Sequence, residues 1–347
     1  MTVSQRVDEM KKITFKYLSQ EDILSLRLSQ EQIISSVRRV LKSHGDGKVQ
    51  MPPKPAVFPR KGRYSFFHAM PAYVEDLDIC GLKWLARVSD NPSLHGLPQF
   101  TGLQVINNPE TGVPLCVMDC RWITVARTTA VSLITAELCS SKDPSTLTIL
   151  GTGLQSRFHA FMFANRFPSI HKIYVYNRSQ EGLQRFIEEM KPRLGPKIVS
   201  ADPEEAVGDA EIIISAGIMQ PLIHLGWIQK GALCIGLDLA RAWHPDVISG
   251  IDRIFTDDTE QFWNRYGTEP EAFNGKPVVA GELSSLLAGK IPSRLYDEER
   301  ILSLNLGMAI CDLALGDLIF REASRQKVGI ELPLMEREDL LPSVFSS

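Results

Sequence analysis

The sequence of 347 residues predicts an α/β protein in which a doubly wound, mostly parallel sheet is joined to a second, α+β domain. Three observations support this fold class. An apolar run at residues 146–150 leads through Gly151-Thr152-Gly153 into a helical pattern near Gln155. Short strands rich in Ile or Val then recur with helical segments between most of them. The first third of the chain lacks this alternation and shows a helix followed by β-like segments.

The turn at Gly151-Thr152-Gly153 is typical of a Rossmann-type site for a dinucleotide. Gly151 permits the tight turn, and Gly153 lets the backbone approach a phosphate. The helix that follows offers free N–H groups and a partial positive charge at its N-terminus. Ser156, at the third motif position, is small enough for close packing of helix on strand. The residues expected at the pyrophosphate are Gly151, Thr152, Gly153, Leu154 and Gln155.

The next predicted strand, residues 172–176, ends in Asn177-Arg178-Ser179, where such folds recognise the adenosine ribose. Asn177 carries no charge that would repel a 2′-phosphate, and Arg178 could pair with one. We therefore expect all three residues to contact the cofactor and NADP(H) to be favoured, with NAD(H) possible. The alternative is that Arg178 is only a solvated loop residue.

Further strands are expected at residues 197–200, 211–215, 232–236 and 253–256. Ligands of parallel α/β sheets bind beyond the carboxyl ends of the strands. Ser215 and Ala216 end one of these strands, and Asp238 follows another. We therefore expect these residues to face the cofactor cleft, with Ser215 and Ala216 in contact with the cofactor.

The first third of the chain predicts a helix followed by strands. Ser29-Gln-Glu-Gln32 reads as a capping box, as does Ser19-Gln-Glu-Asp22, and the apolar residues between Ile33 and Leu41 share one face of a helix. The β-like segments are residues 64–67, 79–88, 101–107 and 115–119. The turn chemistry of residues 108–112 predicts a hairpin between the last two.

Two further helices are expected to connect the domains. One, near residues 125–138, would lead into the parallel sheet, and the helical pattern from Leu302 onward would pack back on the first domain. We therefore expect residues 1–126 and 305–347 to form the first domain. Residues 127–304 would form the dinucleotide-binding domain.

Composition and charge argue against several classes of protein. The net charge is −3 with no long basic run, so no nucleic-acid partner is expected. No apolar run reaches the ~18 residues that span a bilayer, and residues 1–9 lack the apolar core of a signal peptide, which favours a cytoplasmic protein without a membrane partner. The six cysteines form no Cys-x-x-Cys pair and have no histidines clustered near them. We therefore expect reduced thiols and no metal site.

Short segments along most of the chain occur together in a recognisable order. They are residues 51–54, 69–73, 81–84, 96–98, 111–114, 118–119, 126–130, 151–155, 238, 281–282, 289–290 and 306–312. This ordered set resembles the ornithine cyclodeaminase/mu-crystallin family, whose members include ornithine cyclodeaminase, one type of alanine dehydrogenase and ketimine reductases. The resemblance implies an α+β domain for substrate binding and dimerisation beside the Rossmann-type domain, and hence a homodimer.

The resemblance also implies roles for matching residues. Lys54 stands where the family has a carboxylate-binding Arg, a departure because Lys lacks the bidentate fork. Lys83 matches the family Lys and would take part in catalysis or substrate binding. Arg127, beside Thr128, would meet the substrate carboxylate and the cofactor. Asp238 would handle the proton of the substrate nitrogen, as in the cyclodeaminase and alanine dehydrogenase branches; mu-crystallins lack that Asp.

Other departures fall where the family binds substrate and nicotinamide. Gln99 replaces a frequent Thr, and Asn305 lies in a segment that replaces Phe-Lys-Ser-x-Gly. Residues 239–246 replace the Pro-Gly and Glu-Leu pairs that usually follow Asp238. The resemblance therefore implies a retained scaffold with an altered pocket. We expect Gln99 and Met70 to line the substrate site and Asn305 to contact the cofactor.

The residues themselves leave alternatives open. Lys83 lies in an apolar run, where a charge is costly unless it is paired or used; otherwise it would snorkel from an edge strand. Asp238 could cap a helix instead of acting as an acid. Arg127 at a helix start would oppose the helix dipole, which favours an anion there. His68 is either a strand residue, the favoured interpretation, or a pocket residue.

Together these features predict hydride transfer between nicotinamide and the α-carbon of an α-imino or α-amino acid. Arg127 and Lys54 would hold the carboxylate, and Asp238 would be the general acid/base, with His244 the alternative acid. The competing interpretation is a cyclodeaminase that uses NAD catalytically on ornithine-like diamino acids. A second alternative is a cofactor-loaded binding protein without turnover.

Overall fold

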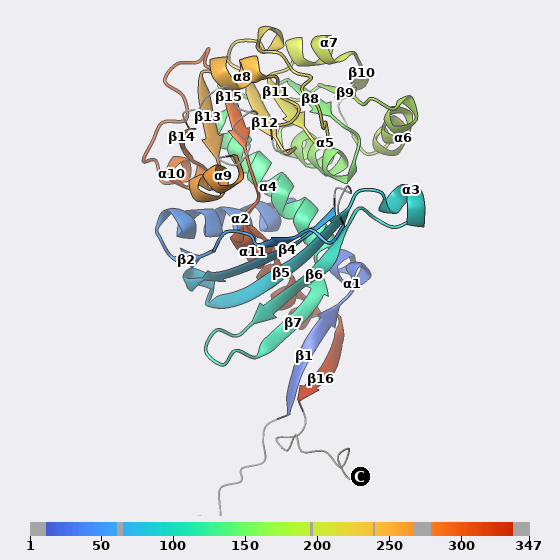
Figure 1. Ribbon diagram of the computed structural model, residues 1–347, viewed down its shortest axis with the longest axis vertical. Helices are drawn as coiled ribbons and strands as arrows, with labels where there is room; N and C mark the ends of the chain where they lie inside the picture. The colour runs from blue at the N-terminus through green and yellow to red at the C-terminus, as the bar shows by residue number, and fades with distance from the viewer. Residues whose placement is uncertain (1–11, 61–64, 195–196, 239, 267–278, 336–347) are drawn as a thin grey trace, which may run out of the picture.

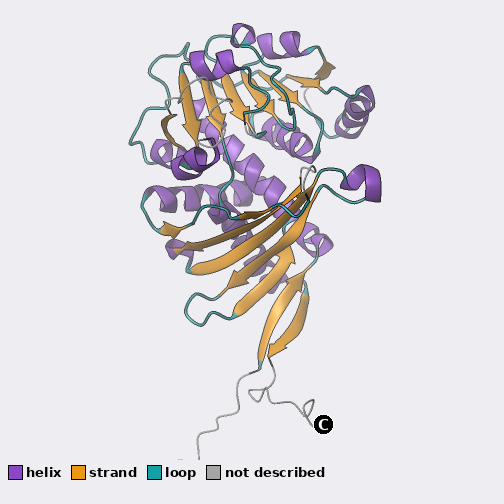
Figure 2. Cartoon of the chain, in the orientation of Figure 1, coloured by secondary structure: helices purple, strands orange, loops and turns teal. Residues whose placement is uncertain are grey.

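The computed structural model describes residues 12–60, 65–194, 197–238, 240–266 and 279–335 (Figure 1). The expectations for residues 1–9 and for Tyr64 and Leu239 lie outside these ranges. Two eight-stranded sheets dominate the molecule, and helices lie between them (Figure 2). This arrangement confirms an α/β fold with a doubly wound sheet and a second, mixed unit.

The first sheet takes its strands from both ends of the described chain. Its order is β16 (Ile330–Met335), β1 (Ile13–Leu18), β7 (Pro114–Asp119), β6 (Phe100–Asn107), β5 (Ile79–Val88), β4 (Ser65–Val74) and β2 (Val49–Gln50), and β3 (Ala56–Val57) also pairs with β4. Only the β1–β7 pair is parallel among its described pairings. The predicted strands β5, β6 and β7 and their hairpin are confirmed, whereas β4 continues well beyond the expected segment, to Val74.

The second sheet is parallel at every described pairing. Its order is β10 (Lys197–Ser200), β9 (Lys172–Tyr176), β8 (Thr146–Leu150), β11 (Ile212–Ser215), β12 (Leu233–Gly236), β15 (Ile301–Leu304), β13 (Arg253–Thr256) and β14 (Val279–Glu282). The six strands predicted between residues 146 and 256 are confirmed. The doubly wound order places the turn after β8 near the centre of the sheet.

The helix expected from Leu302 onward is wrong at its start. Residues Ile301–Leu304 form β15, fully buried between β12 and β13, and the helix α11 begins only at Ala309. A buried strand of four residues, three of them apolar, cannot be distinguished from helix by periodicity alone. The expected packing of this helix on the first unit is confirmed, since α11 (Ala309–Gln326) contacts α2, β4, β5 and β6.

The main helices between the sheets are α2 (Gln30–Gly45), α4 (Arg121–Cys139), α5 (Leu154–Arg166) and α11. Both predicted capping boxes are present, Ser29 on α2 and Ser19 on α1 (Gln20–Ser25). The helix α4 packs on α2 and on α5, so it bridges the two units as predicted, and the boundary expected at residue 126 falls inside it. The other described α-helices are α3 (Asn91–His95), α6 (Gln180–Met190), α7 (Pro203–Gly208), α8 (Pro245–Gly250), α9 (Thr259–Tyr266) and α10 (Leu283–Leu287).

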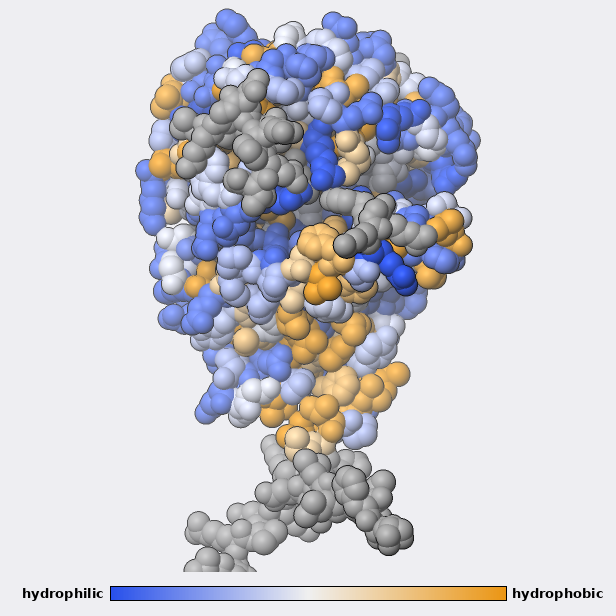
Figure 3. Space-filling model, in the orientation of Figure 1, coloured by the Kyte–Doolittle hydropathy of each residue, from blue (hydrophilic) through white to orange (hydrophobic). Residues whose placement is uncertain are grey.

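Strand β5 shows how the first sheet divides its two faces. Ile79, Gly81, Lys83 and Leu85 are buried in alternation, on the face that α11 covers. Trp84 points to the other face and is 40% exposed. Apolar side chains gather over this lower part of the molecule (Figure 3). None of the helices in the described ranges is long and apolar enough to cross a membrane.

Candidate active site

The turn after β8 has the geometry of a phosphate cradle. Gly151 has φ +106°, and a Cβ there would collide with the carbonyl of Ala216 at the end of β11, so only glycine fits. Open space surrounds the position of a Cβ at Gly153, and no described side chain caps the helix α5 that starts at Leu154. Ser156 is buried beneath the turn, as its predicted packing role requires. The N-terminal N–H groups of α5 are therefore available to a pyrophosphate.

The ribose end of this cradle lies at the start of α6. Ser179 caps that helix, accepting a hydrogen bond from the N–H of Gly182. Asn177 Nδ2 donates to the carbonyl of Ser179, and a Cβ on Gly182 would lie 2.7 Å from Nδ2 and 3.3 Å from Thr152 Oγ1. The turn at Thr152 and the segment 177–179 therefore lie close together. Arg178, between Asn177 and Ser179 in the sequence, is exposed. These residues fit an adenosine ribose, with an exposed cation beside it.

Asp238 is a buried acid at the carboxyl edge of the second sheet. It follows β12 and is 6% exposed, and its Oδ1 accepts a hydrogen bond of 3.1 Å from Ser215 Oγ. Its Oδ2 is buried and has no hydrogen-bond partner among the described residues. Burial raises the pKa of Asp238 to about 7, against the opposing effect of the Ser215 hydroxyl. The side chain is therefore poised to gain or lose a proton near neutral pH, and Ser215 acts on this acid.

Lys83 lies in the interior of the first sheet. It stands on a central strand, is fully buried, and has its Nζ 2.6 Å from Oδ1 of Asp312 on α11. Arg127 Nε donates to the same oxygen at 3.1 Å. Snorkelling from an edge is thus excluded. Arg127 lies in the second turn of α4 and not at its start, so the dipole argument for an anion there was wrong.

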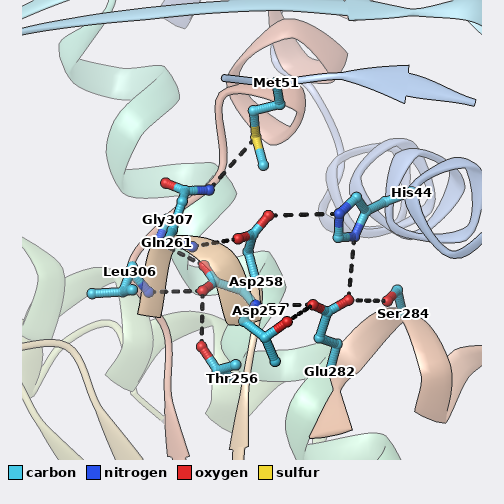
Figure 4. Close-up of polar contacts among 11 residues, drawn as sticks. His44, Met51, Thr256, Asp257, Asp258, Gln261, Glu282, Ser284, Leu306 and Gly307 are labelled. Carbon is cyan, nitrogen blue, oxygen red and sulfur yellow. Dashed lines mark hydrogen bonds and ion pairs between the residues drawn. The ribbon is translucent and has the colours of Figure 1, made fainter. Parts of the chain in front are cut away.

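Lys54 joins this group from the segment between β2 and β3. Its Nζ donates to the carbonyl of Leu306 at 2.7 Å. Asp257 holds the same segment from the other side, accepting hydrogen bonds from the N–H groups of Leu306 and Gly307 (Figure 4). A Cβ on Gly307 would collide with the guanidinium of Arg127. The segment after β15 is therefore clamped between the two sheets, against Lys54 and Arg127.

Electrostatics make this pocket suitable for an anion. Burial, followed by Arg127 and Lys83, lowers the pKa of Lys54 to about 8, although Asp257 opposes this effect. Burial also lowers the pKa of Lys83, with Asp312 opposing, and raises that of Asp257. The pocket thus holds three basic side chains, Lys54, Lys83 and Arg127, but only two carboxylates, Asp257 and Asp312. One ligand carboxylate would balance their charge.

His68 shares the covered face of the first sheet with Met70, which pairs directly with Lys83 across β4 and β5. Burial, then Lys54 and Lys83, lowers the pKa of His68 to about 4, so the imidazole is neutral at neutral pH. The charges of Lys54 and Lys83 therefore both act on His68. The alternative interpretation of His68 as a pocket residue thus gains support. Met70 is buried in the apolar core at the same place.

Other predicted site residues are placed less directly. Gln99 is exposed, and its Nε2 donates to the carbonyl of Ser89, so the structure does not bring its side chain to the pocket. Thr128 donates to the carbonyl of Thr124 within α4. Asn305, directly after β15, accepts from Ser303 Oγ through Oδ1, while its buried Nδ2 has no partner among the described residues. This unpaired N–H donor is suited to the carboxamide oxygen of a nicotinamide cofactor.

Sequence reasoning assigned no role to Asp312 or Asp257. Asp312 lies in the segment 306–312 that carries the resemblance, but its partners come from distant parts of the chain, Arg127 being 185 residues away. The available signal was an acidic residue in a largely apolar helical run, the counterpart of Lys83 in its apolar strand, but Asp317 in the same run gives the same signal. Asp257 carried no comparable signal.

A second polar cluster joins α2 to the edge of the parallel sheet (Figure 4). His44 Nε2 lies 3.6 Å from Asp258 Oδ2, and His44 Nδ1 lies 4.0 Å from Glu282 Oε2. Glu282 also accepts hydrogen bonds from Thr259, at 2.9 Å from N and 2.6 Å from Oγ1, and from Ser284 Oγ at 3.1 Å. This cluster holds the two units together beside the clamped segment.

The chain combines a Rossmann-type dinucleotide cradle, a buried acid at the same sheet edge and a cationic pocket lined from the first sheet, and these features define the class of protein. The model of the ornithine cyclodeaminase/mu-crystallin family matches residues 15–327. The chain belongs to that family.

Individual relatives agree with this assignment. The chain is 30% identical over 335 residues to the N-((2S)-2-amino-2-carboxyethyl)-L-glutamate dehydrogenase of Staphylococcus aureus, with 92% of this chain and 98% of that protein covered. Among solved structures, Thermococcus litoralis Δ1-pyrroline-2-carboxylate reductase in complex with NADH and L-proline gives a TM-score of 0.85 at 26% identity, covering 92% and 100%. An archaeal alanine dehydrogenase dimer with bound NAD gives 0.82 at 25% identity, covering 93% and 100%.

Proposed function

We propose that this protein is an NAD(P)H-dependent oxidoreductase that acts on the C–N bond of a small α-imino or α-amino acid. The observation that carries the proposal is Asp238, a buried acid with a pKa near neutrality and an unpaired Oδ2, at the carboxyl edge of the dinucleotide-binding sheet. Relatives that act on pyrroline-2-carboxylate and on an amino-acid-substituted glutamate support this class of substrate.

The pocket residues have distinct roles in this proposal. Arg127 and Lys54 hold the substrate carboxylate, and Lys83 adds charge from the sheet interior while Asp312 fixes its position. The bound nicotinamide supplies or accepts the hydride. Asp238 donates a proton to the nitrogen during reduction of the C=N bond, and accepts it in the reverse direction.

We further propose that the cofactor is NADP(H) and that two copies of the chain form a dimer. Exposed Arg178 at the ribose end supports the first proposal, and the uncovered apolar face of the first sheet supports the second. The two sheets support a division into a substrate and dimerisation domain, residues 1–126 with 305–347, and a dinucleotide domain, residues 127–304. The bridging helix α4 would then belong to both.

Absorbance of the reduced cofactor tests the activity. The purified protein is mixed with NADPH or NADH and a panel of cyclic imines, or with an α-keto acid and an amine that condense to an imine. Net oxidation of the cofactor is expected with at least one imine. Ammonia release from a diamino acid without net cofactor oxidation would instead indicate a cyclodeaminase. Binding of cofactor and ligand without either reaction would indicate a binding protein.

A further inference from the structure

Two histidines and an aspartate meet in the dinucleotide-binding unit, outside the pocket described above. His224 lies in the connection after β11, His244 in the connection after β12, and Asp246 at the start of α8. Each offers one ligand atom, and these three atoms lie within 4.8 Å of one another. All three side chains are partly exposed, so the cluster is open to a small ion from solvent.

The backbone brings the two histidines side by side. Ile223 and Trp243 form a parallel bridge, and His244 N donates to the carbonyl of Ile223. In each of the two bridged segments the next residue is a histidine, His224 or His244. The two imidazole rings therefore lie side by side, with their centroids 4.2 Å apart. Trp227 stands edge-on against His224 at 5.1 Å. The rings are thus positioned by main-chain pairing and packing, as a preorganised site requires.

Asp246 is fixed between the two rings. Its Oδ2 lies 3.4 Å from His224 Nδ1, and its Oδ1 lies 3.2 Å from His244 Nδ1. Oδ1 also accepts a hydrogen bond from the N–H of Leu225 at 3.2 Å. Ligands of a tetrahedral zinc ion at ~2.0–2.2 Å stand about 3.3 Å from one another. Whichever Asp246 oxygen binds the ion, its separation from the nearer imidazole nitrogen matches one edge of such a tetrahedron, and the one ligand atom that each residue offers lies within 4.8 Å of the others.

We infer that His224, His244 and Asp246 form a binding site for a divalent transition-metal ion of the zinc type. Imidazole nitrogens with one carboxylate select such ions over Mg²⁺ or Ca²⁺, which prefer oxygen ligands. The three residues fill three positions and leave the fourth to water. The expectation of no metal rested on the spacing of the cysteines and on the lack of histidines near them, which says nothing about a site without cysteine. The bound ion would clamp the connection that follows β11 to the one that carries Asp238.

Direct metal binding tests this site. Tag-free protein is stripped with a chelator and titrated with zinc alone by calorimetry, and Co²⁺ is then added as a spectroscopic probe. One zinc per chain, a higher melting temperature with zinc, and visible absorption of bound Co²⁺ are expected. His224→Ala and His244→Ala should each lose all three signals.

Matched controls make the outcome decisive. His171→Ala changes an exposed histidine elsewhere and should keep full zinc binding. Asp246→Asn keeps an oxygen for the N–H of Leu225 but removes the charge, so it should bind zinc more weakly while its melting temperature without metal stays close to that of the wild type. Absence of binding to the wild type would overturn the inference and leave a hydrogen-bonded His–Asp–His cluster. Equal binding by the wild type and both histidine variants would overturn it in favour of ligands elsewhere.

Discussion

The ammonium of Lys83 and the carboxylate of Asp312 form a fully buried ion pair, with Nζ 2.6 Å from Oδ1 and both side chains 0% exposed. Arg127 donates to the same oxygen from α4. One carboxylate therefore positions two basic side chains that come from a strand and a helix on different parts of the chain. Under the proposed function, this arrangement would fix where a substrate carboxylate binds.

Asp312→Asn should destabilise the protein strongly. The change leaves Lys83 and Arg127 buried without their counter-charge, and removing one partner of a buried pair typically costs ~3–5 kcal/mol. Urea unfolding measures this loss. The control is Glu181→Gln on α6, a residue that is 81% exposed and pairs with Arg185, 60% exposed, and it should change the free energy of unfolding by less than ~1 kcal/mol. An equal loss of unfolding free energy in the two variants would show that the buried pair contributes no more to stability than an exposed pair.

Arg178→Ala should weaken NADPH binding while leaving NADH binding nearly unchanged. Only NADPH carries the 2′-phosphate that this exposed guanidinium would meet, and a charge-assisted hydrogen bond contributes ~1.5–3 kcal/mol. Fluorescence titration of both cofactors measures the two affinities. Arg185→Ala serves as control, because Arg185 is an exposed residue of α6 already paired with Glu181. Tighter binding of NADH than NADPH by the wild type would contradict the preference.

Trp84→Asp should convert a dimer into monomers. Trp84 and Leu103 stand directly opposite on β5 and β6 and are 40% and 44% exposed on the face that no described helix covers. A charge there would be desolvated at an apolar interface, at considerable cost. Light scattering measures the mass. Leu295→Asp, at a residue 70% exposed in the other unit, should remain dimeric, and a monomeric wild type would refute the proposal.

The sequence was informative wherever local chemistry decides the structure. The capping boxes at Ser19 and Ser29 and the strand–turn–helix at Gly151 depend on neighbours a few residues apart, and all were predicted. The strand β15 was missed because its four residues, three of them apolar, are too few to show a period of their own. Asp312 was missed because its charge is matched only after the sheet, α4 and α11 come together. Long-range pairing of single charges leaves almost no local pattern.

Asp238→Asn should abolish most turnover while cofactor binding stays nearly intact. An amide cannot exchange the proton, and general acid/base contributions are typically ~10²–10⁴-fold in rate. In the wild type the reduction of C=N needs protonated Asp238, so its rate should fall as pH rises through about 7, while the reverse oxidation should rise over the same range. Steady-state rates against pH in both directions measure this.

Stability gives an independent readout of Asp238. Its folded-state pKa lies above the ordinary value of 3.8, so its contribution to stability is fully present below pH 3.8 and is lost as pH rises to about 7. The Asn variant should lack this part of the pH dependence of unfolding. Ser215→Ala, which removes the hydrogen bond that favours the ionised form, should shift the midpoint of the rate profile to higher pH. A folded Asp238→Asn variant with unchanged turnover would assign the proton to another group.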